Sequence, residues 1–151
     1  MLISLMGTIR RVFQYHGAEH KAINALEAGL PLTQANALAA SRIHPRCGTS
    51  FLIVVMLISM VIYALLPFDG FVARFVARLA LLPLVVGLSY ELIRFAAKRP
   101  GSMLALLTTP GLWLQRVTTK PPSDDQAAIA IHALEGAMNL ERAQGGELVI
   151  A

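Results

Sequence analysis

An uncharged apolar run is the feature that most restricts how this chain can fold. Residues 49–66 contain no charged side chain, and a helix of that length measures about 27 Å, close to the thickness of the hydrocarbon core of a bilayer. A turn-forming segment, PFDG at 67–70, leads into a second apolar stretch at 71–97. The two stretches predict an all-α membrane protein built on a two-span helical hairpin.

The composition supports this fold class. Hydrophobic residues make up 56% of the chain and charged residues 15%, whereas soluble domains contain about 25% charged residues. An ordinary soluble globule and a disordered chain are therefore both disfavoured. The net charge of +4 comes from basic residues that flank the apolar runs without forming one stripe. This pattern favours the lipid bilayer as a partner and argues against nucleic acid.

Basic residues also predict the orientation. They lie before the first apolar run and after the second, so the positive-inside rule places both termini in the cytoplasm. Arg74 and Arg78 lie one turn apart at the start of the second run, where they can reach the far interface, and they weaken the asymmetry. The single cysteine excludes an intrachain disulfide and fits a reducing compartment. We expect a multi-pass protein of the inner membrane.

Before the hairpin, the sequence predicts two helices on the cytoplasmic side or at the interface. Apolar residues recur at helical spacing over residues 8–26, and Gly29 and Pro31 then supply a stop. Thr33 is a candidate N-cap for a short helix at 34–42.

After the hairpin, residues 103–114 are apolar but too few to span a bilayer, so we expect an interfacial or packed helix. A linker at 120–125 precedes a predicted terminal helix at 126–142, with Ile129, Leu134 and Met138 facing inward. The expected divisions of the chain are residues 1–47, the hairpin at 48–99, and residues 100–151.

The segment YHGAEHK at 15–21 contains the pattern H-x-x-E-H. On a helix this spacing puts His16 and His20 one turn apart on one face, where two imidazoles can bind one divalent metal ion. Glu19, next to the second histidine, can orient or deprotonate a metal-bound water, as in inverted zincins. The alternative is a polar helix face with solvated histidines.

A second group of reactive side chains, HPRCGTS at 44–50, comes directly before the first apolar run. His44 or Cys47 is a candidate third ligand, and three protein ligands with an open fourth position are typical of catalytic zinc. Cys47 is alternatively a nucleophile activated by His44, or a small buried residue. Arg46 is a candidate for binding an anionic substrate group, or a positive-inside anchor.

Three further residues are candidates for supporting the site: Tyr15 beside the first motif, and Glu91 and Arg94 in the second apolar stretch. A carboxylate within a membrane segment is costly and needs a partner. Glu91 can pair with Arg94 on its own helix, or reach the metal or Arg46.

Four blocks of this sequence resemble the YqhQ-like family of bacterial membrane proteins. Their order and spacing are those of the family, and the likeness extends from about Ile9 to Leu134. The resemblance implies a metal-dependent enzyme without a specified reaction, with metal binding at His16 and His20 and with Glu19, His44 and Cys47 nearby. The blocks are RRVFQYHGAEHKAI (10–23), HPRCGTSFL (44–52), LPLVVGLSYELIR (82–94) and GLWLQRVTTKPPSDDQ (111–126).

Family members are roughly twice as long, with an N-terminal region rich in glycine and small residues before the first block. If that region contributes substrate contacts or a further membrane segment, we expect the chain to work with a separately encoded N-terminal half or other membrane proteins, or to be an inactive remnant.

Two functions follow as expectations. The first is a metal-dependent hydrolase, with zinc as the first choice of metal, acting on a membrane-proximal substrate through a metal-bound water. The second is a non-catalytic membrane adaptor, or an assembly or insertion factor, in which the same residues form a structural polar or metal site.

Overall fold

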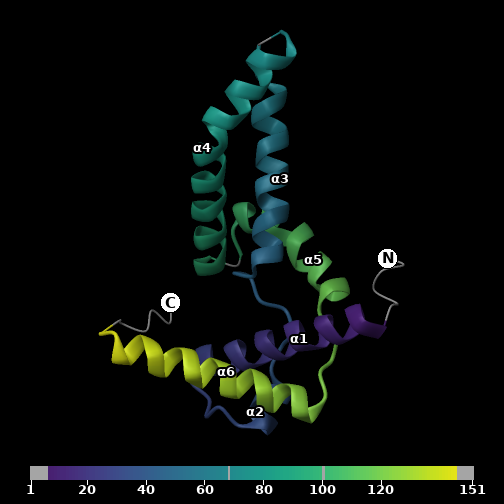
Figure 1. Ribbon diagram of the computed structural model, residues 1–151, viewed down its shortest axis with the longest axis vertical. Helices are drawn as coiled ribbons and strands as arrows, with labels where there is room; N and C mark the ends of the chain where they lie inside the picture. Colours follow the sequence, from purple (N-terminus) through teal and green to yellow (C-terminus); the bar gives the residue numbers. More distant parts are fainter. Residues whose placement is uncertain (1–6, 68, 100, 146–151) are drawn as a thin grey trace. The chain divides into compact units, whose positions relative to one another are not determined.

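The computed structural model describes residues 7–67, 69–99 and 101–145, and every regular element in these ranges is helical (Figure 1). This confirms the all-α fold class. The elements are α1 (Gly7–Glu27), α2 (Gln34–Ala39), α3 (Gly48–Ala64), α4 (Phe71–Lys98), the 3-10 helix η2 (Met103–Thr108), α5 (Thr109–Thr118) and α6 (Asp124–Ala143).

The chain divides into two compact units. The first unit combines residues 1–44 with residues 116–151, and the second unit comprises residues 45–115. The segment expected at 100–151 therefore contributes to both units.

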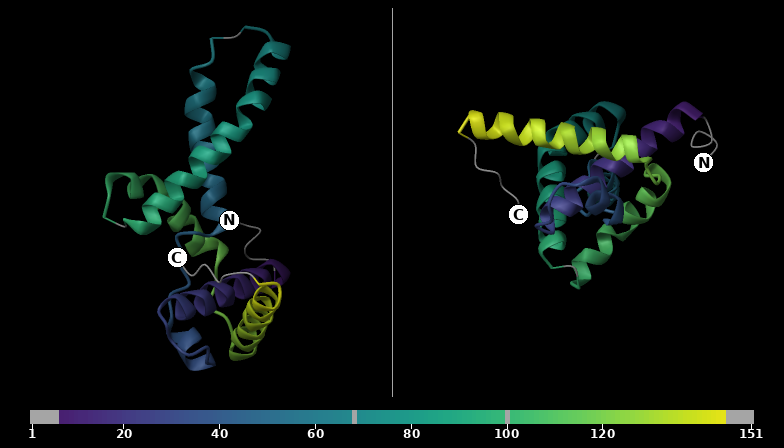
Figure 2. Two further views of the ribbon diagram at one scale, coloured as in Figure 1. Left: turned by 90° about the vertical axis from the view of Figure 1, so that its left-hand side faces the viewer. Right: turned by 90° about the horizontal axis from the view of Figure 1, so that it is seen from below.

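The first unit consists of α1, α2 and α6. Helices α1 and α6 lie side by side, and α2 packs against both (Figure 1 and Figure 2). Small side chains at the contact let the helix backbones approach closely. The core of the unit comprises Ala18, Ala22, Ala37, Ala130 and Ile131, with Leu32 and Leu134 partly buried against it.

Local capping sets the ends of these helices. After α1, Gly29 has a positive φ of 69°, and the Leu30 N–H donates to the Ala25 carbonyl, which gives a Schellman-type stop. The Thr33 hydroxyl accepts a hydrogen bond from the Asn36 N–H and starts α2, as predicted. Ser123 and Gln126 form a capping box at the start of α6.

Two details of the sequence prediction for the first unit are wrong. Helix α2 ends at Ala39 and not at residue 42, because the chain turns there to lie along α1. In α6, Ile129 is 53% exposed, whereas Ala130 and Ile131 are buried. The inward face of α6 is therefore rotated toward Ala130 and Ile131, which belong to the core of the unit.

The second unit is organised around the pair α3 and α4, which pack along each other with Val54 and Val85 buried (Figure 1). Near the turn between them, the Tyr63 hydroxyl donates to the Arg78 carbonyl at 3.2 Å. Helix α5 meets α3 where Gly111 lies against Ser50, and the Gln115 side-chain amide donates to the Ser50 hydroxyl at 2.6 Å. The expected interfacial helix at 103–114 is thus split into η2 and α5.

Among the described helices, α4 alone is long and apolar enough to cross a membrane. It has 28 residues, or about 42 Å, whereas α3 has 17 residues, or about 26 Å. The most apolar part of α4 is only 6% buried within the structure. The helical hairpin is therefore present as an antiparallel pair, and its crossing of the bilayer twice is a proposal.

Candidate metal centre

The segment 118–121 crosses α1 directly over Gly17. The Lys120 N–H donates to the Phe13 carbonyl at 2.8 Å, and a Cβ atom at Gly17 would overlap the Lys120 carbonyl oxygen. Only glycine permits this approach. The crossing brings the Thr118 carbonyl within reach of His16.

His16 and His20 each have one ring nitrogen tied to a backbone carbonyl. The Nδ1 of His16 lies 3.0 Å from the Thr118 oxygen, and the Nδ1 of His20 lies 2.7 Å from the Arg42 oxygen. Because a carbonyl oxygen only accepts hydrogen bonds, Nδ1 carries the proton in both neutral rings and Nε2 carries the lone pair. This is the tautomer that metal-ligating histidines adopt when their outer nitrogen is held by the protein.

The two imidazoles also lie close to each other. Their ring centroids are 4.4 Å apart in a T-shaped arrangement with an interplanar angle of 72°. One ring nitrogen of each residue lies within 4.8 Å of the other. The predicted pair is therefore present as two adjacent imidazoles on α1, and its binding of a metal ion stays a prediction.

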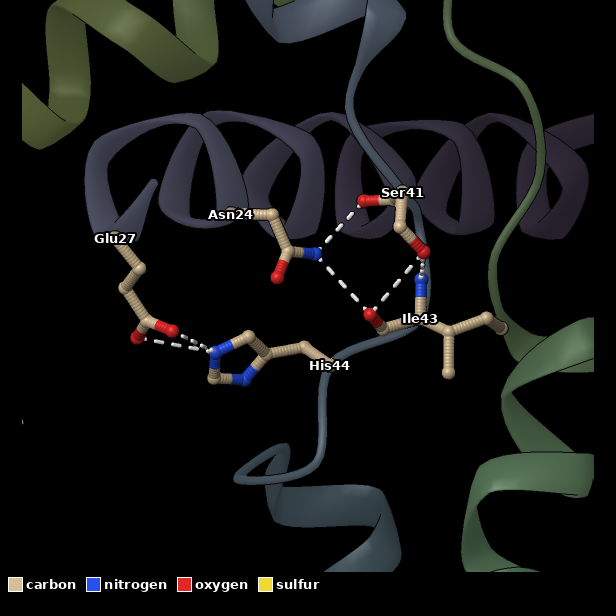
Figure 3. A network of polar contacts seen from close by, with 5 residues as sticks. All are labelled: Asn24, Glu27, Ser41, Ile43 and His44. Atoms are coloured by element: carbon tan, nitrogen blue, oxygen red, sulfur yellow. Dashed lines mark hydrogen bonds and ion pairs between the residues drawn. The ribbon is translucent and has the colours of Figure 1, made fainter. Parts of the chain in front are cut away.

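His44 is the third imidazole of this unit. Its ring centroid lies 5.9 Å from that of His20, and its Nε2 lies 3.2 Å from both carboxylate oxygens of Glu27. Figure 3 shows the imidazole directed toward Glu27 at the end of α1. A carboxylate bonded to a histidine is the usual outer partner of a metal-ligating imidazole.

Asn24 fixes the segment that leads to His44. Its side-chain amide donates to the carbonyls of Ser41 at 2.8 Å and Ile43 at 3.1 Å (Figure 3). Since these bonds hold the backbone just before His44 against α1, the position of the imidazole is set by the fold and not by its own rotamer alone.

The cation nearest to these histidines in sequence is Lys21. Its ammonium donates to the carbonyls of Leu38 at 2.7 Å and Ala40 at 2.6 Å, at the end of α2. Burial lowers the pKa of Lys21 below its ordinary value of 10.5, and the nearby positive charge of Arg42 lowers it further.

The predicted site residues of this unit differ in their burial. His20 and His44 are buried, His16 and Tyr15 are half-buried, and the Glu19 side chain is exposed. The Arg11 guanidinium carbon lies 5.9 Å from the centre of the Tyr15 ring.

Four predicted site residues belong to the second unit. Cys47 is buried at the N-cap of α3, with its sulfur 3.2 Å from the Thr49 hydroxyl, and Arg46 is exposed. Glu91 and Arg94 form an ion pair of 3.6 Å on α4, with both side chains more than half exposed. A ligand role for Cys47 and a substrate role for Arg46 stay predictions from the sequence.

Sequence reasoning missed Glu27, Asn24 and the two carbonyl oxygens that hold the histidines. The backbone partners cannot be recognised from the residue types in the sequence, because every residue has a carbonyl oxygen. Gly17 did give a signal, since an isolated glycine inside a helix often marks a close backbone contact.

Comparisons with known proteins cover most of the chain. Residues 1–140 match the family described as protein of unknown function (DUF1385). The chain is 45% identical over 140 residues to an uncharacterized protein, YqhQ, of Bacillus subtilis (strain 168), which covers 92% of this chain and 44% of the relative. The chain thus spans less than half the length of this relative. No solved structure matches the chain.

Proposed function

The chain belongs to the DUF1385 family and is YqhQ-like, as its four sequence blocks predict. We propose that it is a membrane-associated protein that binds a divalent metal ion through His16 and His20. The observation that supports the proposal is the geometry of the two rings, which are adjacent and have each Nδ1 held by a backbone carbonyl. Nitrogen ligands of this kind suit zinc and other late divalent metals.

The third ligand comes from the segment that begins at His44. In the same unit, His44 is a candidate, because its ring centroid lies 5.9 Å from that of His20 and its imidazole is bonded to the Glu27 carboxylate, as metal-ligating histidines often are. Cys47, three residues later, is the alternative that the sequence predicts. A zinc ion with three protein ligands supplies a Lewis acid at its open position.

The membrane part of the proposal rests on the exposed apolar surface of the second unit. Large apolar side chains of α4 such as Phe71, Leu79 and Leu84 are more than half exposed. Exposing this apolar surface to water is unfavourable, whereas exposing it to lipid is not. We propose that α3 and α4 cross the inner membrane in opposite directions. Both termini would then lie in the cytoplasm, on the side where basic residues flank the two helices.

The chemical part of the proposal is hydrolysis of a membrane-proximal substrate. Glu19 precedes a buried histidine and is itself exposed, so its carboxylate is free to accept a proton from a water molecule that attacks the substrate. In this reaction the histidines hold the metal and Glu19 is the general base.

Metal content tests the binding proposal. The full chain, purified in detergent and dialysed against zinc, should contain about one zinc per chain, and the double variant His16→Ala, His20→Ala should contain less than a tenth of that. His132→Ala is the matched control, because His132 is exposed on α6. Equal zinc in all three proteins would refute the site.

Glu19→Gln separates chemistry from binding. We expect this variant to retain zinc and to lose hydrolysis of a model phosphodiester or carboxylic ester by about 10²–10⁴-fold, the usual contribution of a general base. Retained zinc together with unchanged hydrolysis would refute the role of Glu19.

The second candidate function is a non-catalytic membrane adaptor or assembly factor. The bonds from His16 and His20 to backbone carbonyls favour it, because they tie the last residue of α5 and the segment after α2 to α1. Stable co-purification with a membrane complex, combined with normal growth of cells that carry Glu19→Gln, would favour the adaptor. Partners would then include other membrane proteins.

A further inference from the structure

The second unit contains a cavity that the proposed metal site does not use. Its volume is about 280 Å³, and it lies between the C-terminal end of α4 and the η2–α5 segment. Most of its wall is hydrocarbon, from Ile93, Ala96, Ala97, Ala105, Leu106 and Leu112. A cavity of this size and lining suits an apolar ligand group.

The hydroxyl groups of the wall are mostly committed to the backbone. The Ser102 hydroxyl accepts a hydrogen bond from the Ala105 N–H at 3.2 Å, and the Thr108 hydroxyl donates to the Ala105 carbonyl at 2.8 Å. The cavity therefore offers few polar partners, so a sugar or a nucleotide would lose its hydrogen bonds to water there, whereas a hydrocarbon chain would not.

Two cations lie at the end of α4, close in sequence to residues of the cavity wall. Lys98 and Arg99 are exposed. In sequence they lie between two groups of wall residues, Ala96–Ala97 and Gly101–Ser102. The Arg99 guanidinium carbon lies 5.1 Å from the centre of the Phe95 ring. Within the part of the chain that the structure describes, neither cation forms an ion pair with a carboxylate.

The neighbouring helix η2 exposes apolar side chains in the same region. Met103 is 91% exposed, Leu106 70% and Leu107 51%. Exposed apolar residues next to cations are typical of segments that lie in the headgroup region of a bilayer. With the membrane association proposed above, the cavity would lie at the boundary between lipid headgroups and acyl chains.

We propose that this cavity holds an acyl chain of an anionic phospholipid, with the phosphate bound by Lys98 and Arg99. The apolar wall matches the chain, and the two cations match the headgroup. The inference rests on the membrane association proposed above and is independent of the metal site. It names the class of molecule, a phosphate-bearing lipid, that the protein selects from the bilayer.

Lipid retention by cavity-filling variants tests the proposal. The full chain is equilibrated in detergent with phosphatidylglycerol, and the bound lipid is counted by native mass spectrometry. Ala97→Leu and Ala105→Leu place extra methyl groups in the cavity and should each lower retained lipid at least fivefold. Ala80→Leu is the matched control, since Ala80 is exposed on α4 outside the wall, and it should retain lipid as the wild type does.

Headgroup selection is the second readout. The wild type should retain phosphatidylglycerol at least fivefold better than phosphatidylcholine with the same acyl chains, and Lys98→Gln with Arg99→Gln should remove this preference. Arg74→Gln with Arg78→Gln, at the other end of α4, should leave it intact. Circular dichroism confirms that each variant keeps its helix content, so that a lost fold is not mistaken for a lost site.

Two results would overturn the inference: wild-type lipid retention in both cavity-filling variants, or no preference of the wild type for the anionic lipid. Flotation with vesicles of phosphatidylglycerol and phosphatidylcholine separates this failure from that of the proposed function. A wild type that floats while its cavity variants keep their lipid contradicts the cavity alone. A wild type that does not float contradicts membrane association and the cavity together.

Discussion

Gly17 is the residue on which the first unit depends most closely, because the backbone of residues 118–121 passes over it. We expect Gly17→Ala to lower the free energy of unfolding by about 1–3 kcal/mol, since the new methyl group meets a backbone carbonyl that cannot move independently. Urea unfolding of the full chain in detergent measures this change.

Gly136→Ala is the matched control for that substitution. Gly136 lies inside α6, and a methyl group added there would meet no heavy atom within 4 Å, so alanine should raise stability by about 0.5–1 kcal/mol through its better helix propensity. Similar effects at both positions would mean that the crossing over α1 is not as the structure places it.

Lys21 gives the first unit a dependence on pH. The lowered pKa means that the folded chain releases this proton at a lower pH than the unfolded chain, whose lysine titrates near 10.5. The unfolded state then binds more protons between these two values, so the contribution of Lys21 to stability rises as pH increases through that window.

Lys21→Met isolates this contribution. At neutral pH the variant should be less stable by about 1–3 kcal/mol, because two carbonyls at the end of α2 lose their donor. The difference in unfolding free energy between wild type and variant should then grow with pH up to about 10.5. A difference that shrinks over this range would contradict the direction of the pKa shift.

At the scale of single residues, the sequence could predict which side chains matter but not what holds them. His16 and His20 are four positions apart, so helical geometry alone brings them together. Their carbonyl partners are 102 and 22 residues away along the chain. Such contacts depend on how the segments pack, and spacing within one motif says nothing about them.

Among the elements, α6 has the most explicit start. The Ser123 hydroxyl accepts a hydrogen bond from the Gln126 N–H, and the Gln126 side-chain oxygen accepts one from the Ser123 N–H. Ser123→Ala should destabilise the first unit by about 1 kcal/mol, whereas Ser123→Asp should be close to neutral, because aspartate also caps. Hydrogen exchange at the first turn of α6 checks both, and equal protection in wild type and Ser123→Ala would contradict the capping role.

Helix starts were predictable because their determinants are local. Thr33 and Ser123 bond to backbone groups three residues ahead, and the stop after α1 is equally local, because it depends on Gly29. Helix faces and the end of α2 depended on tertiary contacts instead. The break between η2 and α5 and the inward rotation of α6 toward Ala130 follow from packing against other helices, which periodicity within one segment does not encode.

For the whole molecule, the exposed apolar surface of α4 predicts membrane insertion. In cells, the wild type should remain in the membrane fraction after alkaline extraction. Leu84→Arg with Leu88→Arg should weaken insertion strongly, because each arginine near the centre of a span costs about 2.5–3.5 kcal/mol; both leucines are more than half exposed. Leu140→Arg, on the exposed side of α6, is the control and should have no effect. Release of the wild type by alkaline extraction would contradict the span.

The division into two units was not predictable from the order of elements along the chain. Residues 1–44 fold with residues 116–151, although the apolar pair lies between them in sequence. What brings them together is a set of small residues on α1, α2 and α6, whose alanines do not stand out in the composition. Hydropathy identifies the apolar helices well because it sums over many residues, and it identifies this alanine contact poorly.

X-ray absorption at the zinc edge can show whether His16 and His20 together bind a metal ion. For the zinc-loaded full chain, we expect a nitrogen shell at about 2.0–2.1 Å with the multiple scattering of at least two imidazoles, and we expect the double variant His16→Ala, His20→Ala to lose it. A spectrum with oxygen ligands alone, or one that is the same in the double variant, would contradict metal binding by these two histidines.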